Sequence, residues 1–131
     1  MKRQITHRED IEFLVDEFYK KVVVDDTIGH IFNDIAHLSW DKHIPIMYQF
    51  WESILLGNMT YRGNVMLAHI ELNRLTPLTK THFEQWKHLF FETLDTYFEG
   101  EKVAEAKQRA ETMSQLMMFK IEQSQHRHFI Q

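Results

Sequence analysis

Apolar residues recur every three or four positions along most of the chain, a spacing typical of amphipathic α-helices. The first such stripe consists of Ile11, Leu14, Val15, Phe18 and Val22. Thr6 and Glu9 precede it at the spacing of a capping box, so the pattern predicts a helix that extends to about Val24. Tyr19 lies at the edge of the stripe.

A short turn and a second long helix are predicted next. Asp25-Asp26-Thr27 interrupts the first helix and is able to cap a short helical turn that runs through Ile31 and Phe32. Residues 33–39 are expected to form a loop. A long helix is predicted from about Trp40 to Leu56, with Gly57 at its end. One broad face of that helix carries Trp40, His43, Met47, Phe50, Trp51, Ile54 and Leu55.

The second half of the chain predicts one short and two long helices. Residues 57–80 are turn-rich around a brief apolar stretch, Val65–Ile70, which predicts about two helical turns with His69 near their end. Thr81 and Glu84 form a second capping box, for a helix that Gly100 ends. A last helix begins near Glu101, and its polar tail from about residue 123 is expected to fray. The pattern therefore predicts an all-α chain.

Length, composition and charge indicate the number of domains, the classes of partner and the expected location of the protein. A length of 131 residues fits one domain spanning residues 1–131, and 44% hydrophobic with 13% aromatic residues is enough apolar material to surround a ligand. The net charge of -4 is spread without long single-sign runs, so neither nucleic acid nor an anionic membrane is an expected partner. No signal-like segment and no run of roughly 20 apolar residues occurs, and a cytoplasmic location is expected.

The absence of cysteine excludes thiolate metal sites, iron–sulfur clusters and covalently attached c-type haem. Nine histidines remain as candidate ligands, yet the His-Glu-x-x-His motif of zinc sites is missing. The acid-x-x-His pair that a di-iron bundle needs twice occurs once, at Asp34 and His37 in the predicted loop. Sites built from several protein ligands are therefore disfavoured.

Haem needs only one imidazole from the protein and an apolar slot, because the porphyrin supplies four nitrogens. His69 lies among apolar residues, and His43 precedes Met47 and Phe50 on one helix face, so the two histidines could face each other across a flat cofactor. The pattern leaves open that both are ordinary solvated or hydrogen-bonded histidines. Periodicity alone does not decide between these interpretations.

Seven segments in order make the chain resemble the truncated globins, and within them the third group. They are Phe18-Tyr19-Lys20-Lys21-Val22, Ile31-Phe32-Asn33, Trp40-Asp41-Lys42-His43, Phe50-Trp51, Leu55-Leu56-Gly57, Ala68-His69-Ile70-Glu71-Leu72 and residues 83–90 from Phe83 through Trp86 to Phe90. The Gly-Gly motifs of the other two groups are absent, in agreement with the third group.

The resemblance implies a shortened globin fold, a two-over-two helical sandwich around one non-covalent haem b (iron protoporphyrin IX). His69 is then the metal ligand, and Tyr19, His43 and Trp86 bind the gas on the opposite face of the haem. The other expected cofactor contacts are Phe32, Met47, Phe50, Trp51, Leu55, Tyr61, Arg62, Met66, Arg74 and Phe83, with Tyr61, Arg62 and Arg74 as candidates for the propionates. Pro45 disfavours helical geometry just after His43, which leaves open whether that imidazole faces the pocket or swings between pocket and solvent as a gate.

The expected ligands are O2, NO, CO or another small diatomic gas. Because several donors would hold O2 too tightly for delivery, redox chemistry is favoured: detoxification of reactive oxygen or nitrogen species, of the nitric oxide dioxygenase or peroxidase kind, with electrons from an unidentified reductase. A non-catalytic gas sensor or an oxygen-storage protein is the alternative. A cofactor-free helical interaction module is a third hypothesis.

Overall fold

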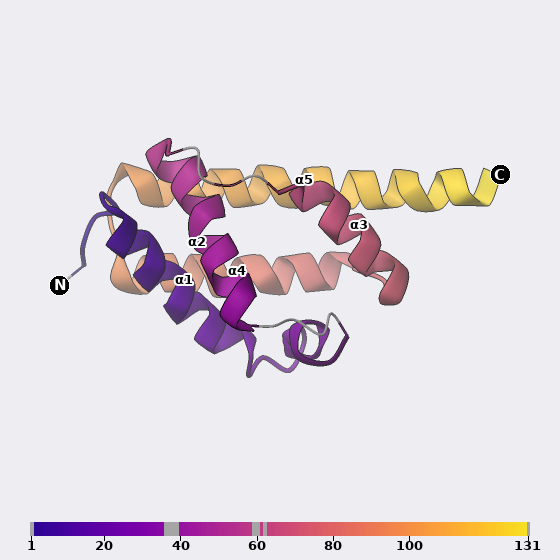
Figure 1. Ribbon diagram of the computed structural model, residues 1–131, viewed down its shortest axis with the longest axis horizontal. Helices are drawn as coiled ribbons and strands as arrows, with labels where there is room; N and C mark the ends of the chain where they lie inside the picture. The colour runs from indigo at the N-terminus through magenta and orange to yellow at the C-terminus, as the bar shows by residue number, and fades with distance from the viewer. Residues whose placement is uncertain (1, 36–39, 59–60, 62, 131) are drawn as a thin grey trace.

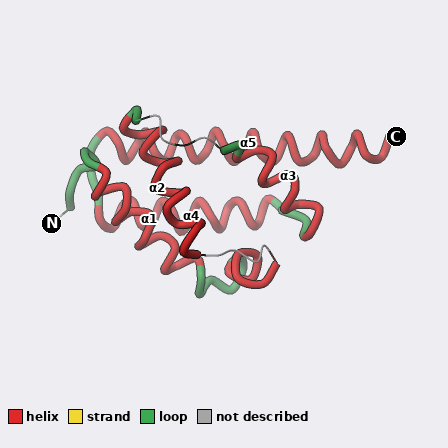
Figure 2. The backbone as a smooth tube through the Cα atoms, viewed as in Figure 1, coloured by secondary structure: helices red, strands yellow, loops and turns green. Residues whose placement is uncertain are grey.

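The computed structural model describes residues 2–35, 40–58, 61 and 63–130, and most of this part of the chain is helical (Figure 1). The elements are α1 (Arg8–Val22), the π-helix η1 (Ile31–Ile35), α2 (Trp40–Leu56), α3 (Val65–Leu75), α4 (Lys80–Tyr97) and α5 (Glu101–Ile130). Figure 2 shows the same path, with short loops between the helices. The prediction of an all-α fold is confirmed.

Two pairs of helices form the body of the molecule. α4 and α5 lie side by side along its long axis (Figure 1). α1 and α2 pack against each other, and they run obliquely over that pair, α1 in contact with α4 and α2 with α5. The shorter helix α3 packs against α5. The core between the pairs is apolar, and Phe18, Phe90 and Leu94 are among its fully buried members. This is the predicted two-over-two arrangement.

Both predicted capping boxes are wrong by one or two residues. At α1 the Asp10 carboxylate, not Glu9, accepts hydrogen bonds from the backbone N–H groups of Thr6 and His7, each at 3.0 Å. At α4 the N-cap is Thr79, whose hydroxyl accepts from the N–H of His82 at 3.4 Å. Several residues near each helix start are able to cap it, and the chain geometry selects among them.

The helix α2 has the predicted bounds, and Gly57 ends it with a φ of 74°. The helix runs through Pro45 without a break, although proline removes the N–H that would bond to the carbonyl of Asp41. The predicted loop from Asn33 is wrong at its start, because the π-helix continues to Ile35; residues 36–39 lie outside the described part of the chain.

The helix α3 is longer than predicted, with 11 residues from Val65 to Leu75. Asn64 caps it by accepting from the N–H of Leu67 at 3.0 Å. His69 therefore lies in the middle of α3 and not near its end. No residue of α3 is fully buried.

The amino-terminal segment is held by backbone hydrogen bonds, whereas the carboxyl-terminal segment continues as helix α5. The backbone of Arg3 bonds to Tyr97 and Glu99, which fastens the amino-terminal segment to the connection between α4 and α5. At the other end α5 continues to Ile130, beyond the point where the sequence predicts fraying. Among the described residues, no helix combines the length and the apolar character that crossing a bilayer requires.

Candidate functional site

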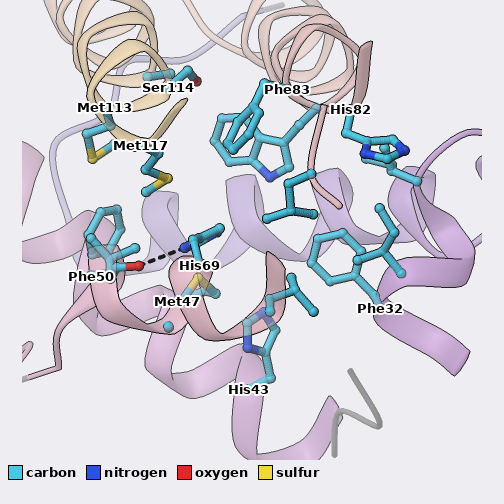
Figure 3. Close-up of a pocket in the computed structure, with 18 of the residues that line it drawn as sticks. Phe32, His43, Met47, Phe50, His69, His82, Phe83, Met113, Ser114 and Met117 are labelled. Atoms are coloured by element: carbon cyan, nitrogen blue, oxygen red, sulfur yellow. Dashed lines mark hydrogen bonds between the residues drawn. The ribbon is translucent and has the colours of Figure 1, made fainter. Parts of the chain in front are cut away.

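One cavity of about 490 Å³ opens beside α3, a size typical of cofactor sites. Its walls come from all the helices, and Figure 3 shows side chains of α2, α4 and α5 around His69. The lining residues are Tyr19, Ile28, Ile31, Phe32, His43, Ile46, Met47, Phe50, Trp51, Tyr61, Val65, Ala68, His69, Glu71, Leu72, Leu75, Leu78, His82, Phe83, Trp86, Ala110, Met113, Ser114 and Met117.

The His69 imidazole is oriented by its own helix. Its Nδ1–H donates to the backbone carbonyl of Val65 at 2.7 Å, the dashed line in Figure 3. Burial lowers the pKa of His69 below its usual value, although the hydrogen bond to Val65 raises it. The neutral ring therefore carries its proton on Nδ1 and keeps the lone pair of Nε2 free. A hydrogen bond from the second ring nitrogen is the usual way in which proteins orient a metal-binding histidine.

Tyr19 and His43 meet at another wall of the cavity. The Tyr19 hydroxyl lies 3.4 Å from Nε2 of His43, a long hydrogen bond. Burial raises the pKa of the Tyr19 hydroxyl, so this group stays protonated and able to donate. Burial also lowers the pKa of His43, and the neighbouring His69 lowers it further. His43 is therefore neutral at pH 7.

Trp86 completes the predicted polar set. Its ring stacks on Phe90, with centroids 5.1 Å apart, and meets the ring of Phe18 edge-on at 5.2 Å. Both partners are buried, so the indole is held in one orientation while it lines the cavity. An indole N–H is a donor only.

The structure brings most of the predicted contact residues to this cavity. Besides Tyr19, His43, His69 and Trp86, the cavity is lined by Phe32, Met47, Phe50, Trp51, Tyr61 and Phe83.

Three of the predicted contacts that the structure describes do not line the cavity. Leu55 is 1% exposed and belongs to the core between the helices. Met66 packs instead on the cluster of Phe83, Met117 and Ile121. Arg74 is exposed in the last turn of α3 and is not among the lining residues. Arg62 lies outside the described residues.

Other lining residues were not predicted as contacts. Half of them are apolar positions of α3 and α5, including Leu72, Met113 and Met117. The polar additions are Glu71, His82 and Ser114. The Nδ1 of His82 accepts from the N–H of Thr79 at 3.1 Å, which leaves the proton of the neutral ring on Nε2. No spacing rule marks this residue, because a capping box has Glu or Gln, not histidine, three residues after the threonine.

The donor set fits haem. The described residues contain no group of three or more His, Asp or Glu side chains that could hold a metal ion, so His69 would act as a single protein ligand. The apolar walls match a porphyrin, which needs a dry slot. In addition, α3 buries no residue fully against the protein, yet Val65, Ala68 and Leu72 line the cavity. This helix has an apolar face that a flat cofactor would cover.

An all-helical two-over-two fold whose apolar cavity holds a histidine with a free Nε2 is typical of the globin class. A family model described as bacterial-like globin matches residues 3–122. The group 3 truncated haemoglobin of Campylobacter jejuni is 32% identical over 126 residues, which cover 92% of this chain and 97% of that protein. The crystal structure of the group III truncated haemoglobin from Campylobacter jejuni matches with a TM-score of 0.81 and 31% identity, over 92% of this chain and 95% of that one.

The chain therefore belongs to the truncated globins of group III, which confirms the resemblance seen in the sequence. Membership of this family implies a haem cofactor and the binding of small gas molecules such as O2.

Proposed function

We propose that the protein holds haem b through Nε2 of His69 and binds a diatomic gas on the side of Tyr19, His43 and Trp86, where it carries out redox chemistry on reactive oxygen or nitrogen species. The observation that carries the proposal is the pairing, in one apolar cavity, of a histidine with a free Nε2 and a buried tyrosine hydroxyl beside a neutral histidine.

His69 is prepared to bind iron before the cofactor arrives. The Val65 carbonyl fixes both the tautomer and the tilt of the ring, so no proton has to leave Nε2 when it coordinates. Haem, when bound, supplies a gas-binding iron and one electron: O2, NO and that electron together give nitrate, and a one-electron donor outside this chain restores the iron.

Tyr19 and Trp86 supply hydrogen bonds to the gas. Both rings are fixed by aromatic neighbours, so little side-chain entropy is lost when they donate. A hydrogen bond to a charged partner contributes about 1.5–3 kcal/mol, and about 1.4 kcal/mol is a factor of ten. Two such donors would slow the release of O2 by about two to four orders of magnitude, which is unsuited to delivery.

The same donors are able to orient O2 for attack by NO, or to polarise the O–O bond of a bound peroxide. Nitric oxide dioxygenase-like or peroxidase-like chemistry is therefore proposed over carriage, with an unidentified reductase as electron source and the cytoplasm as the location. Gas sensing or oxygen storage without turnover is the competing function.

The propionates of the haem would lie at the open rim of the cavity. Of the three residues predicted to meet them, Tyr61 lines the cavity and packs edge-on against Phe50, with ring centroids 5.1 Å apart. Its hydroxyl is the proposed propionate contact. The Nε2–H of His82 is a second donor available to a carboxylate in the cavity.

A single-turnover experiment tests the redox proposal. The haem-loaded protein, saturated with O2, is mixed with one equivalent of NO, and both the absorption spectrum and the nitrate formed are measured. Rapid conversion to the ferric spectrum with one nitrate per haem is expected. Displacement of O2 by NO without nitrate would instead favour sensing or storage. The variant Tyr48→Phe is a matched control, because it removes a hydroxyl from α2 that bonds Asp16 and does not line the cavity.

A further inference from the structure

Trp40 is the centre of an aromatic cluster on the side of the cavity where Tyr19 and His43 meet. It stacks on Phe32 with centroids 6.0 Å apart and an interplanar angle of 22°. Its edge contacts with Tyr19 and His43 have centroid distances of 5.5 and 5.8 Å. Tyr19, His43 and Phe32 line the cavity, whereas Trp40 contacts all three rings without lining it.

A chain of hydrogen bonds fastens Trp40 to the end of α1. The Trp40 indole N–H donates to the side-chain oxygen of Asn33 at 3.3 Å. The amide of Asn33 donates in turn to the backbone carbonyl of Val23 at 3.0 Å. We call Asn33 and Trp40 together the latch. It connects the first turn of α2 to a residue that is independent of the cavity.

The first turn of α2 needs such support. Pro45 has no N–H, so the carbonyl of Asp41 lacks its usual helical partner, and this turn has fewer backbone bonds than an ordinary one. Trp40 and His43 are three residues apart and share one face of the helix. A movement of this turn would therefore carry the His43 imidazole with it.

This wall of the cavity is also close to solvent. Ile46, on the next turn of α2, lines the cavity and is nevertheless 43% exposed. His43 is half-buried at the same wall. A gas molecule that arrives past α2 meets His43 before it meets Tyr19.

We propose that Trp40, fastened by Asn33, is a positioning residue that holds the His43 imidazole against the Tyr19 hydroxyl and thereby restricts the access of gases to the cavity. The inference rests on the proposed function in one respect, that the gas binds on the Tyr19 side of the haem. The latch sets the fraction of molecules in which His43 is displaced, and the association rate of a gas is proportional to that fraction.

The test measures the association of CO after flash photolysis of the haem-loaded protein. Trp40→Phe keeps a ring over Phe32 and His43 but loses the indole N–H, and Asn33→Ala removes the acceptor. Each variant should raise the CO association rate about two- to tenfold, the shift expected when a neutral hydrogen bond is lost. Tyr48→Phe is the control on the same helix and should leave the rate unchanged.

A double-mutant experiment tests whether Trp40 acts by positioning His43 or by blocking the entry of gas itself. In His43→Ala the CO rate should already be high, and adding Trp40→Phe should change it no further, because the residue that Trp40 positions is gone. The C–O stretching bands of the CO complex should also redistribute in Asn33→Ala, since they report the donors near the gas.

Two results would overturn the proposal: an unchanged CO rate in both latch variants, or an equal rise from Trp40→Phe with and without His43. Failure of the proposed function has a different signature, because it would appear as an unchanged rate of O2 release in Tyr19→Phe.

Discussion

The substitution Tyr19→Phe isolates one hydroxyl in the cavity. The ring of Tyr19 packs against Phe18, Phe32 and Trp40 at centroid distances of 4.8, 6.0 and 5.5 Å, and phenylalanine preserves all these contacts. The hydroxyl has a weak protein partner, His43 Nε2 at 3.4 Å, so it is available to a bound gas. The substitution should therefore remove the hydrogen bond from Tyr19 to the bound gas and change little else in the cavity.

The expected magnitude follows from the charge that O2 gains when it binds iron. A hydrogen bond to such a partner contributes about 1.5–3 kcal/mol, so its loss should speed O2 release by about ten- to a hundredfold. Release is measured by stopped flow, with CO in excess to capture the emptied haem. CO gains less negative charge than O2, and its own dissociation rate should change much less.

Tyr48→Phe serves as the control for this experiment, since it removes a tyrosine hydroxyl outside the cavity. An O2 release rate in Tyr19→Phe equal to that of the parent protein would refute the assignment of Tyr19 as a donor. Equal acceleration of O2 and CO release would also refute it, because that pattern indicates a general loosening of the cavity.

Three further outcomes are expected. Trp86→Phe retains a ring against Phe18 and Phe90 and should speed O2 release by about tenfold, because one hydrogen-bond donor is lost. The same stopped-flow assay measures this rate, and an unchanged rate would show that the indole does not reach the gas. Asp25→Ala should destabilise the protein by about 0.5–2 kcal/mol at pH 7 in urea unfolding, because the carboxylate accepts from the N–H groups of Thr27 and Ile28 and from Gln85. Burial raises the pKa of Asp25, but these hydrogen bonds outweigh it and hold the pKa below its usual value. The stabilisation is therefore present above the unfolded-state pKa of about 3.9 and is lost as the pH falls through the lower folded-state pKa. The difference in unfolding free energy between the parent protein and Asp25→Ala should narrow below about pH 4. A difference that stays constant with pH would argue against a role for the charge.

Long, regularly striped helices were predictable from the sequence alone. The bounds of α2 follow from a continuous apolar face and from a terminal glycine that adopts a positive φ. The π-helix at Ile31–Ile35 was not predictable, because no spacing rule distinguishes it from an irregular turn.

The helix α3 was underestimated for a physical reason. Its inner side faces the cavity and its outer side faces solvent, so no residue is fully buried and Leu67 and Leu75 are 50% and 69% exposed. Its pattern therefore lacks the clear contrast of a helix that packs on protein. Apolar periodicity in a sequence reflects burial against protein, and α3 has little such burial.

Some residues of the candidate site were also predictable from helical spacing, and others were not. Helical spacing placed Tyr19, His43 and Trp86 on or beside inward faces, but the choice of His69 among nine histidines came from the family resemblance. Met113 and Met117 reach the cavity only because α5 packs beside α3, and a contact between segments so far apart in the sequence leaves no local signal.

Resonance Raman spectroscopy of the ferrous, gas-free protein tests the central claim, that Nε2 of His69 holds the haem iron, most directly. An iron–imidazole stretching band that shifts when histidine is labelled with ¹⁵N is expected in the parent protein and in His43→Ala. The band should disappear in His69→Gly and return when imidazole is added. Its persistence in His69→Gly without imidazole, or its loss in His43→Ala, would contradict the account.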